Sequence, residues 1–172
     1  MYKRPDFEEL LKKWVNRNVV TDTMSDIFDG EIWKTFPSRL DTPNSPRFFA
    51  PETADSHLGI IINLDWFQPF DSSVYSCGVI YGAICNLPRE ERFKKENILT
   101  LDLLPGPNEV KLDRINHYLA PIIDELLELW NGINLPASDK YPAGKKNQIG
   151  SNMLFERYTG CKEIMRSYIR IS

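Results

Sequence analysis

The sequence predicts an α/β domain in which an antiparallel meander of three strands precedes a helix. Three apolar stretches, residues 58–67, 74–87 and 98–104, have the length and composition of strands, and turn signals or a charged connection separate them. Their short connections favour antiparallel neighbours. A longer stretch that ends at Gly132 carries apolar residues at helical spacing.

The first predicted strand organises the rest of the chain. Residues 58–70 read LGIIINLDWFQPF, with aliphatic side chains on both faces, which is typical of a central strand. Pro69 has no backbone N–H to donate to a sheet, so we expect the strand to end near Phe67. A single carboxylate, Asp65, stands close to that end.

Asp65 has two interpretations on the residues alone. A charged carboxylate at the end of an apolar strand is costly unless a cation or hydrogen bonds compensate it. A divalent cation would make Asp65 a metal ligand. Alternatively, Asp65 is structural and caps the following turn or pairs with an arginine or lysine.

The second and third strands supply further candidate residues. The second, residues 74–87, is apolar on both faces and is therefore also expected to be central. Cys77 and Cys85 are expected to fill the core, because no cationic neighbour in the sequence would activate them as nucleophiles. In the third strand, residues 98–104, Asp102 is either a second carboxylate for a metal site or an acid that faces solvent.

The helix that ends at Gly132 has two possible starts. It begins at Asp113 and kinks at Pro121, or it begins at Ala120 with Pro121 at the first helical position, which proline favours. In both cases Gly132 is a natural C-cap and one apolar stripe faces the core. The stripe consists of Ile115, Leu119, Ile122, Leu126 and Trp130.

The N-terminal part predicts a short helix followed by loops. Residues 5–17 have the spacing of an amphipathic helix with Asp6 as its N-cap, and residues 37–57 are rich in proline and small polar residues. The acidic residues between them lack the alternate spacing and the terminal glutamate of a calcium-binding loop, so we expect them to be structural. These residues are Asp22, Asp26, Asp29 and Glu31.

We expect three regions along the chain. Residues 1–57 form a helical and loop-rich segment that packs on the core, residues 58–132 form the core, and residues 133–172 form a divergent tail. The core region holds five more acidic than basic residues, whereas the tail holds four more basic than acidic ones. A basic tail is either a solvated surface or a modest nucleic-acid footprint. Within it, residues 152–171 are predicted to form a helix that Gly160 weakens.

Composition excludes several classes of protein. The 172 residues suffice for one domain, and no apolar run reaches the roughly 18 residues that a membrane span needs. Three cysteines without a CxxC pair favour a reducing, intracellular compartment and argue against a zinc knuckle built from this chain alone. Only two histidines are present, His57 and His117, which excludes a histidine-rich metal site.

Six pieces of the sequence resemble a known family. They read RPDFEELLKKW, SDIFDGEIWKTF, LGIIINLDWFQPF, YSCGVIYGAICNLPREERFKKENIL, LLPGPNEV and INHYLAPIIDELLELWNGI. In order and spacing they resemble the transposases of CACTA-type (En/Spm-like) DNA transposons, in the form found in fungal genomes. The resemblance covers residues 4–133, and DWFQPF and NLPREERFK are its most specific parts.

The resemblance implies an RNase H-like catalytic core, of which the predicted meander and helix are the opening part. Its implied chemistry is metal-dependent cleavage and strand transfer at DNA phosphodiester bonds, with two Mg²⁺ or Mn²⁺ ions held by converging carboxylates. Asp65 matches the first of these carboxylates, which implies a catalytic and metal-binding role. The implied partner is DNA at transposon ends, and the implied location is the nucleus.

The sequence also departs from this family. The family continues after the helix with a strand that ends in Cys-Asp, followed by Pro-Ala. Here Gly132 runs directly into INLPA, so we expect that strand to be missing and Asn134 to stand in place of the second aspartate. An amide keeps an oxygen ligand but loses the charge, and metal binding is then expected to be weak or absent.

Two functions follow as hypotheses. The first is a truncated, transposase-derived fragment that is inactive alone, with an exposed apolar patch that promotes self-association. The second is a non-catalytic α/β module that binds protein or DNA. A second carboxylate near Asp65, contributed by Asp71 or Asp102, would distinguish the two hypotheses: without one, a catalytic role for this polypeptide fails.

Overall fold

The structure is a computed structural model, and it describes most of the chain. The described residues are 4–20, 22–39, 42–71, 74–111, 114–137 and 141–150, with the backbone alone for 147–150. The helix predicted for residues 152–171 lies outside them.

Four helices, four 3-10 turns and five strands make up the described fold. The helices are α1 (Phe7–Lys12), α2 (Glu31–Thr35), α3 (Arg89–Arg92) and α4 (Asn116–Trp130). The strands are β1 (His57–Phe67), β2 (Cys77–Ile84), β3 (Ile98–Leu104), β4 (Ile133–Leu135) and β5 (Lys145–Gly150). The 3-10 turns are η1 (Lys13–Asn16), η2 (Ile27–Asp29), η3 (Pro51–Thr53) and η4 (Lys95–Asn97).

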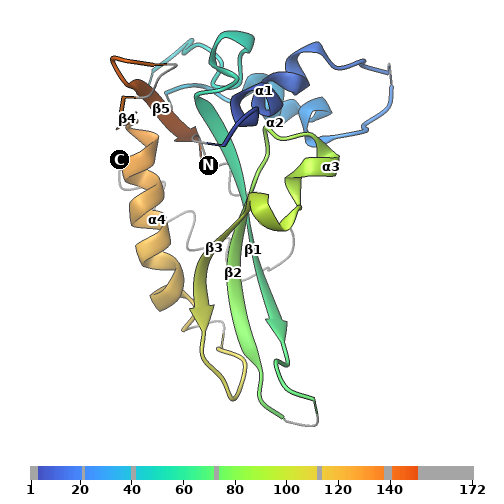
Figure 1. The fold of residues 1–172 in the computed structure, drawn as a ribbon, viewed down its shortest axis with the longest axis vertical. Coiled ribbons are helices and arrows are strands. Elements are labelled where there is room, and N and C mark those ends of the chain that lie inside the picture. Colours follow the sequence, from blue (N-terminus) through green and yellow to red (C-terminus); the bar gives the residue numbers. More distant parts are fainter. Residues whose placement is uncertain are drawn as a thin grey trace.

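The five strands form one mixed sheet in the order β3-β2-β1-β5-β4. The pairs β1–β2 and β2–β3 are antiparallel, so the predicted meander is confirmed, as is the central position of β1 and β2. Figure 1 shows these three strands running down the molecule, with the N-terminal helices gathered at one end. The start of β1 therefore lies at the end of the sheet where the N-terminal helices gather, and its last residues lie toward the other end.

The prediction that no strand follows the helix is wrong. Strand β4 pairs with β5 in antiparallel fashion, and β5 pairs with β1 in parallel at residues 57–59. The sequence gives little sign of β5, because KKNQIG is mostly polar and lacks the alternation of a half-buried strand. Pairing with the edge of β1 supplies its stability instead.

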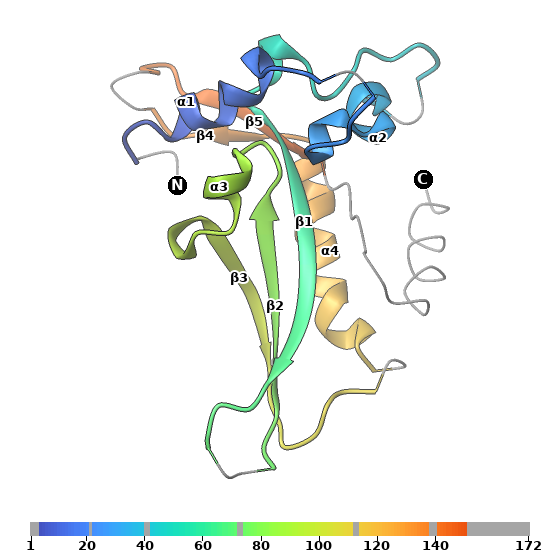
Figure 2. The ribbon, with the colours of Figure 1, turned by 90° about the vertical axis from the view of Figure 1, so that its right-hand side faces the viewer.

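Helix α4 covers one face of the sheet. It begins at Asn116 and contains Pro121, so the longer of the two predicted helices is closer to the structure. Figure 2 shows α4 along one side of the strands. Between them lies the largest core cluster, formed by Ile60, Ile62, Ile80, Leu104, Ile115, Leu119, Ile122, Ile123 and Leu126. None of the described helices has the length and apolar character needed to cross a membrane.

The N-terminal segment packs on the same end of the sheet from which β1 starts. In α1, Phe7 and Leu11 are fully buried and contact Leu58 and Ile84. The predicted N-cap role of Asp6 is wrong, because its side chain makes no capping hydrogen bond and its φ is 62°. Apolar contacts, rather than a cap, therefore hold this helix in place.

An aromatic cluster covers the start of β1 on the face that α4 does not fill. Trp33 stacks on Phe49 with ring centroids 3.7 Å apart, and Phe48 stacks on Trp130 at 5.3 Å. A Cβ added to Gly59 would lie 3.0 Å from the Phe49 ring, so a glycine is needed for this close approach. The cluster consists of Trp14, Phe28, Trp33, Phe36, Phe48, Phe49 and Trp130.

Candidate functional site

Asp65 lies two residues before the end of β1 and is exposed to solvent. Its Oδ1 accepts a hydrogen bond from the backbone N–H of Trp66 at 2.9 Å. No salt bridge to Asp65 is found within the described ranges. The carboxylate is thus placed on a rigid central strand with one local hydrogen bond.

The face to which Asp65 projects follows from the strand register. Asp65 pairs with Val79 on β2, and Val79 pairs with Leu103 on β3, so these three side chains share a face. It is the face opposite α4, because the neighbouring residues Leu64 and Trp66 pack against the α4 core. Leu103 is 62% exposed, which shows that this part of the face is open.

Asp102 does not converge with Asp65. It pairs with Ile80, a fully buried member of the α4 core, and therefore projects to the face opposite that of Asp65. Its Oδ1 accepts a hydrogen bond from the N–H of Leu103 at 2.8 Å. A whole strand, β2, also separates the two residues. Asp102 is thus not a second carboxylate for a site at Asp65.

Asn134 lies far from Asp65. It pairs with Lys146 on β5, and its strand β4 is at the outer edge of the sheet. Strand β5 meets β1 no further than Gly59, and six more residues of β1 lead to Asp65, a length of about 20 Å at the usual rise of a strand. The predicted equivalence of Asn134 with the family's second aspartate is therefore wrong in this structure.

The described residues do not fit a divalent metal site. Among them no group of three or more His, Cys, Asp or Glu side chains lies close enough together to hold a metal ion. Asp71, the remaining candidate from the sequence, is exposed in the connection between β1 and β2. Asp65 is the one sequence-derived candidate that stands on the exposed face of a central strand.

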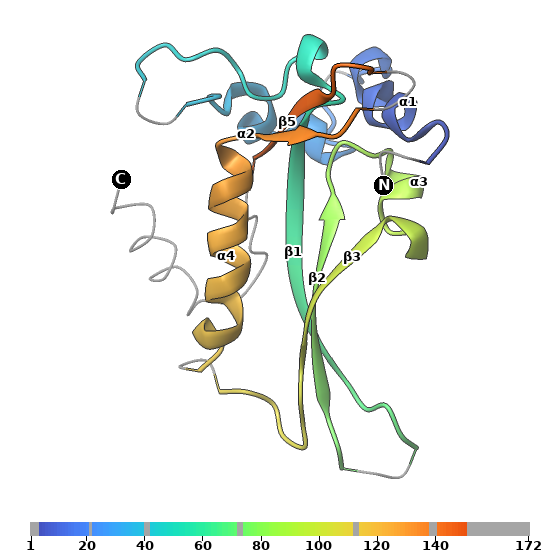
Figure 3. The same cartoon turned by 60° about the vertical axis from the view of Figure 1, so that its left-hand side comes forward.

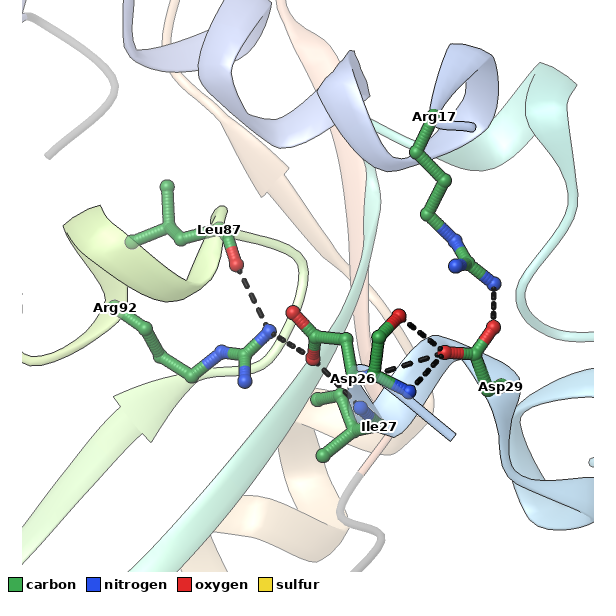
Figure 4. A network of polar contacts seen from close by, with 7 residues as sticks. Arg17, Asp26, Ile27, Asp29, Leu87 and Arg92 are labelled. Atoms are coloured by element: carbon green, nitrogen blue, oxygen red, sulfur yellow. Dashed lines mark hydrogen bonds and ion pairs between the residues drawn. The ribbon is translucent and has the colours of Figure 1, made fainter. Parts of the chain in front are cut away.

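Two of the acidic residues before α2, Asp26 and Asp29, are paired with arginines. Arg92, which is buried, donates through Nη2 to Asp26 Oδ1 at 2.8 Å and to the Leu87 carbonyl at 3.1 Å. Arg17 pairs with Asp29, and this contact holds the pKa of the Asp29 carboxyl well below its usual range. Figure 4 shows both pairs within one network. Asp26 therefore ties the N-terminal segment to the core through Arg92, whereas Asp29 holds two parts of that segment together through Arg17.

Sequence reasoning missed a second ionic cluster, which joins β5 to the N-terminal helix. Lys145 Nζ lies 3.2 Å from Asp55 Oδ2 and 3.4 Å from Glu8 Oε1. The Tyr141 hydroxyl donates to Glu8 at 2.9 Å, and Lys12 Nζ lies 2.6 Å from Asp55. The partners are up to 137 residues apart in the chain, so no local sequence pattern could reveal them.

Exposed apolar side chains gather near Asp65, at the end of the β1–β2 hairpin and on β3. Phe67 is 43% exposed and pairs with Cys77 across the hairpin. Phe70, Val74 and Leu103 are exposed by 62% or more. The self-association expected from such a surface stays a prediction.

The fold and the position of Asp65 define a class: a mixed α/β domain with a lone exposed carboxylate on its central strand. A model of the transposase family tnp2 matches residues 21–148, which is most of the chain. The chain therefore belongs to this family, the family of the CACTA (En/Spm) transposases. No curated protein and no solved structure matches it.

Proposed function

We propose that this domain is the opening part of a transposase catalytic region with an RNase H-like core, in which Asp65 is the first metal-binding carboxylate. The family match over residues 21–148 carries the proposal. The order of an antiparallel meander followed by a helix and a further strand agrees with it. The proposed partner is DNA at transposon ends, and the proposed location is the nucleus.

The described residues supply binding and orientation rather than a complete centre. A central strand, hydrogen-bonded to β2 on one side, fixes the backbone at Asp65. Cleavage of a phosphodiester by two divalent cations needs several carboxylates that converge on the same point. Because Asp65 has no such partner within the described ranges, we expect these residues alone not to cleave DNA.

A calorimetric titration with Mn²⁺ tests the role of Asp65. The comparison is between the full chain and its Asp65→Asn variant, with Asp102→Asn as the matched control because Asp102 projects to the opposite face. Saturable binding that disappears in Asp65→Asn and persists in Asp102→Asn would support the proposal. Equal heats for all three proteins would contradict it.

A second function is favoured by the open apolar surface beside Asp65. In this alternative the domain is a non-catalytic module that binds protein or DNA through the end of the sheet, where Phe70 and Leu103 are exposed. The same titration separates the two functions. A module of this kind would show no Mn²⁺ binding, and replacing Leu103 with serine would weaken its association with the partner.

A further inference from the structure

Hydrogen bonds close the connection between α2 and β1 at its base. Pro37 forms an antiparallel bridge with Arg47. Beside it, the Ser38 N–H donates to the Pro46 carbonyl at 2.7 Å. In Figure 3 the described part of this connection reaches out beyond the sheet. Exposed connections are the parts of a fold that other proteins and enzymes reach most readily.

Two hydroxyl residues in this connection stand directly before a proline. They are Thr42, before Pro43, and Ser45, before Pro46, and no other serine or threonine of the chain precedes one of its 12 prolines. A serine or threonine followed by proline is the acceptor sequence of proline-directed protein kinases. Thr42 and Pro46 are exposed, and Ser45 is half-buried. Sequence and exposure thus make both hydroxyls candidate phosphate acceptors.

The surroundings of the Ser45 hydroxyl distinguish it from other hydroxyls. The Arg39 backbone N–H donates to Ser45 Oγ at 2.9 Å, and the Ser38 hydroxyl lies 2.9 Å from the same atom. The contact from Ser45 Oγ to the Pro46 carbonyl is longer, at 3.5 Å. Arg39 and Arg47 are both exposed, and they stand on either side of Ser45 along the chain. Hydrogen-bond donors and positive charge are the groups that stabilise a phosphate.

We propose that Ser45 is a phosphorylation site whose phosphate is held by Ser38, Arg39 and Arg47. In the transfer, Ser45 Oγ attacks the γ-phosphorus of ATP within a proline-directed kinase. The new O–P bond forms as the bond between this phosphorus and ADP breaks, and the hydroxyl proton passes to a base of the kinase. The product carries about two negative charges and three acceptor oxygens. This site is independent of the role proposed for Asp65.

Ser25 provides a contrast within the same segment of the chain. It is also exposed, but its Oγ donates to Asp29 Oδ2 at 2.9 Å. The next residue is Asp26 rather than a proline. A phosphate on Ser25 would lie against a carboxylate and would be repelled by it. Ser25 is therefore the matched control for Ser45.

Phosphate at Ser45 would act on the packing at the start of β1. The Phe48 N–H donates to the Phe36 carbonyl at 2.8 Å, directly beside the bridge that closes the connection. Both rings belong to the aromatic cluster, and their centroids lie 5.9 Å apart. A phosphate that draws the two sides of the connection together holds these rings in place. Modification of an exposed loop thereby stabilises the packed end of the sheet.

Treatment of the full chain with a proline-directed kinase and ATP tests the acceptor. Tandem mass spectrometry locates the phosphate. We expect phosphate on Ser45, its loss in Ser45→Ala and in Pro46→Ala, and no change in Ser25→Ala. Phosphate on Thr42 alone would overturn the proposal. The absence of phosphate from the chain, with a kinase that modifies a control peptide, would overturn it as well.

Thermal unfolding tests how the phosphate is held. The phosphorylated protein should have a Tm about 2–4 °C above that of the unmodified protein, because charge-assisted contacts are added at the base of the connection. The gain should largely disappear when Arg39→Gln and Arg47→Gln are combined. It should persist in Lys95→Gln, at an exposed position of η4. An unchanged or lower Tm on phosphorylation, or a gain that survives the loss of both arginines, would overturn the phosphate site.

A charged substitution gives the same test without a kinase. Ser45→Glu should unfold at a higher temperature than the uncharged Ser45→Gln, and the difference should be smaller than that given by phosphate because a carboxylate carries less charge. The difference should vanish in the background that lacks Arg39 and Arg47, and it should shrink at high salt. A Ser45→Glu protein that is no more stable than Ser45→Gln would contradict an anion-binding environment at this position.

Discussion

The two halves of β1 differ in almost every physical respect. At its start, Gly59 donates its N–H to the buried Asn86 side chain, aromatic rings cover one face, and β5 pairs with the edge. At its end, Asp65 and Phe67 are exposed, and β2 is the one strand within the described ranges that pairs with them. One continuous strand therefore joins a tightly packed region to an open one.

This difference separates the part of β1 that stabilises the fold from the part that is accessible to a ligand. Groups that bind a ligand must be accessible, and they are usually drawn from the less stable parts of a fold. The packed start of β1 anchors the strand, so that a carboxylate at its open end can be held in position without being buried. Substitutions at the start should therefore change stability strongly, and those at the end should change it little.

Replacing Phe48 with alanine should give the largest effect. Phe48 is fully buried, and its ring lies 4.4 Å from His57 and 5.3 Å from Trp130 between centroids. The lost contacts and the resulting cavity should lower the free energy of unfolding by about 3–5 kcal/mol. Urea denaturation followed by tryptophan fluorescence measures it. The control Phe67→Ala, at the open end, should lower the free energy of unfolding by less than about 1 kcal/mol. Equal losses for the two variants would contradict the difference between the two ends of β1.

Replacing Asn86 with alanine should be the next most damaging change. Its Oδ1 accepts from the Gly59 N–H at 2.9 Å, and its Nδ2 donates to the carbonyls of Ala54 and His57 at 3.1 and 2.9 Å. The substitution removes three hydrogen bonds, two of them fully buried, and should cost about 2–4 kcal/mol. Chemical denaturation measures this cost. The exposed Asn134→Ala variant is the control and should unfold like the parent protein.

His57 should make stability depend on pH. Burial lowers its pKa below the ordinary value of 6.5, although its hydrogen bond with the Phe48 carbonyl opposes this shift. The unfolded chain therefore binds the proton more readily. The stabilising contribution is complete above pH 6.5 and is lost as pH falls from 6.5 through the lowered pKa.

Urea midpoints measured between pH 7.5 and pH 5 check this dependence. His57→Gln should flatten the profile, whereas His117→Gln, at an exposed position of α4, should leave it unchanged. A profile that flattens with the His117 substitution, or that keeps its slope without His57, would assign the effect to another group.

Asp65→Asn should have the smallest effect on stability. Asp65 is exposed and makes one local hydrogen bond to the Trp66 N–H, which an asparagine side chain can also accept. The free energy of unfolding should change by no more than about 0.5 kcal/mol. Differential scanning calorimetry without metal checks this. A loss of several degrees in Tm would mean that Asp65 is structural.

The meander and the helix could be predicted because their signals are local. An apolar face is buried in β1, by the run from Leu58 to Leu64, and in α4, by its apolar stripe. Strand β3 has the predicted bounds Ile98–Leu104. Strand β5 could not be predicted, because its polar residues are held by pairing with a distant strand. The family resemblance implied Asn134 as the counterpart of an aspartate, but the structure places Asn134 on β4, two strands from β1.

The sequence by itself determined which residues form the core strands and that an acid stands near the end of the first, because hydrophobic periodicity is a property of neighbouring residues. Only the tertiary structure decided which face each acidic side chain occupies and which residue it contacts. It turned Asp102 toward α4, paired Asp26 with Arg92 across 66 residues, and left Asp65 on an open face. Register and long-range pairing set these relations, and they depend on how distant segments pack together.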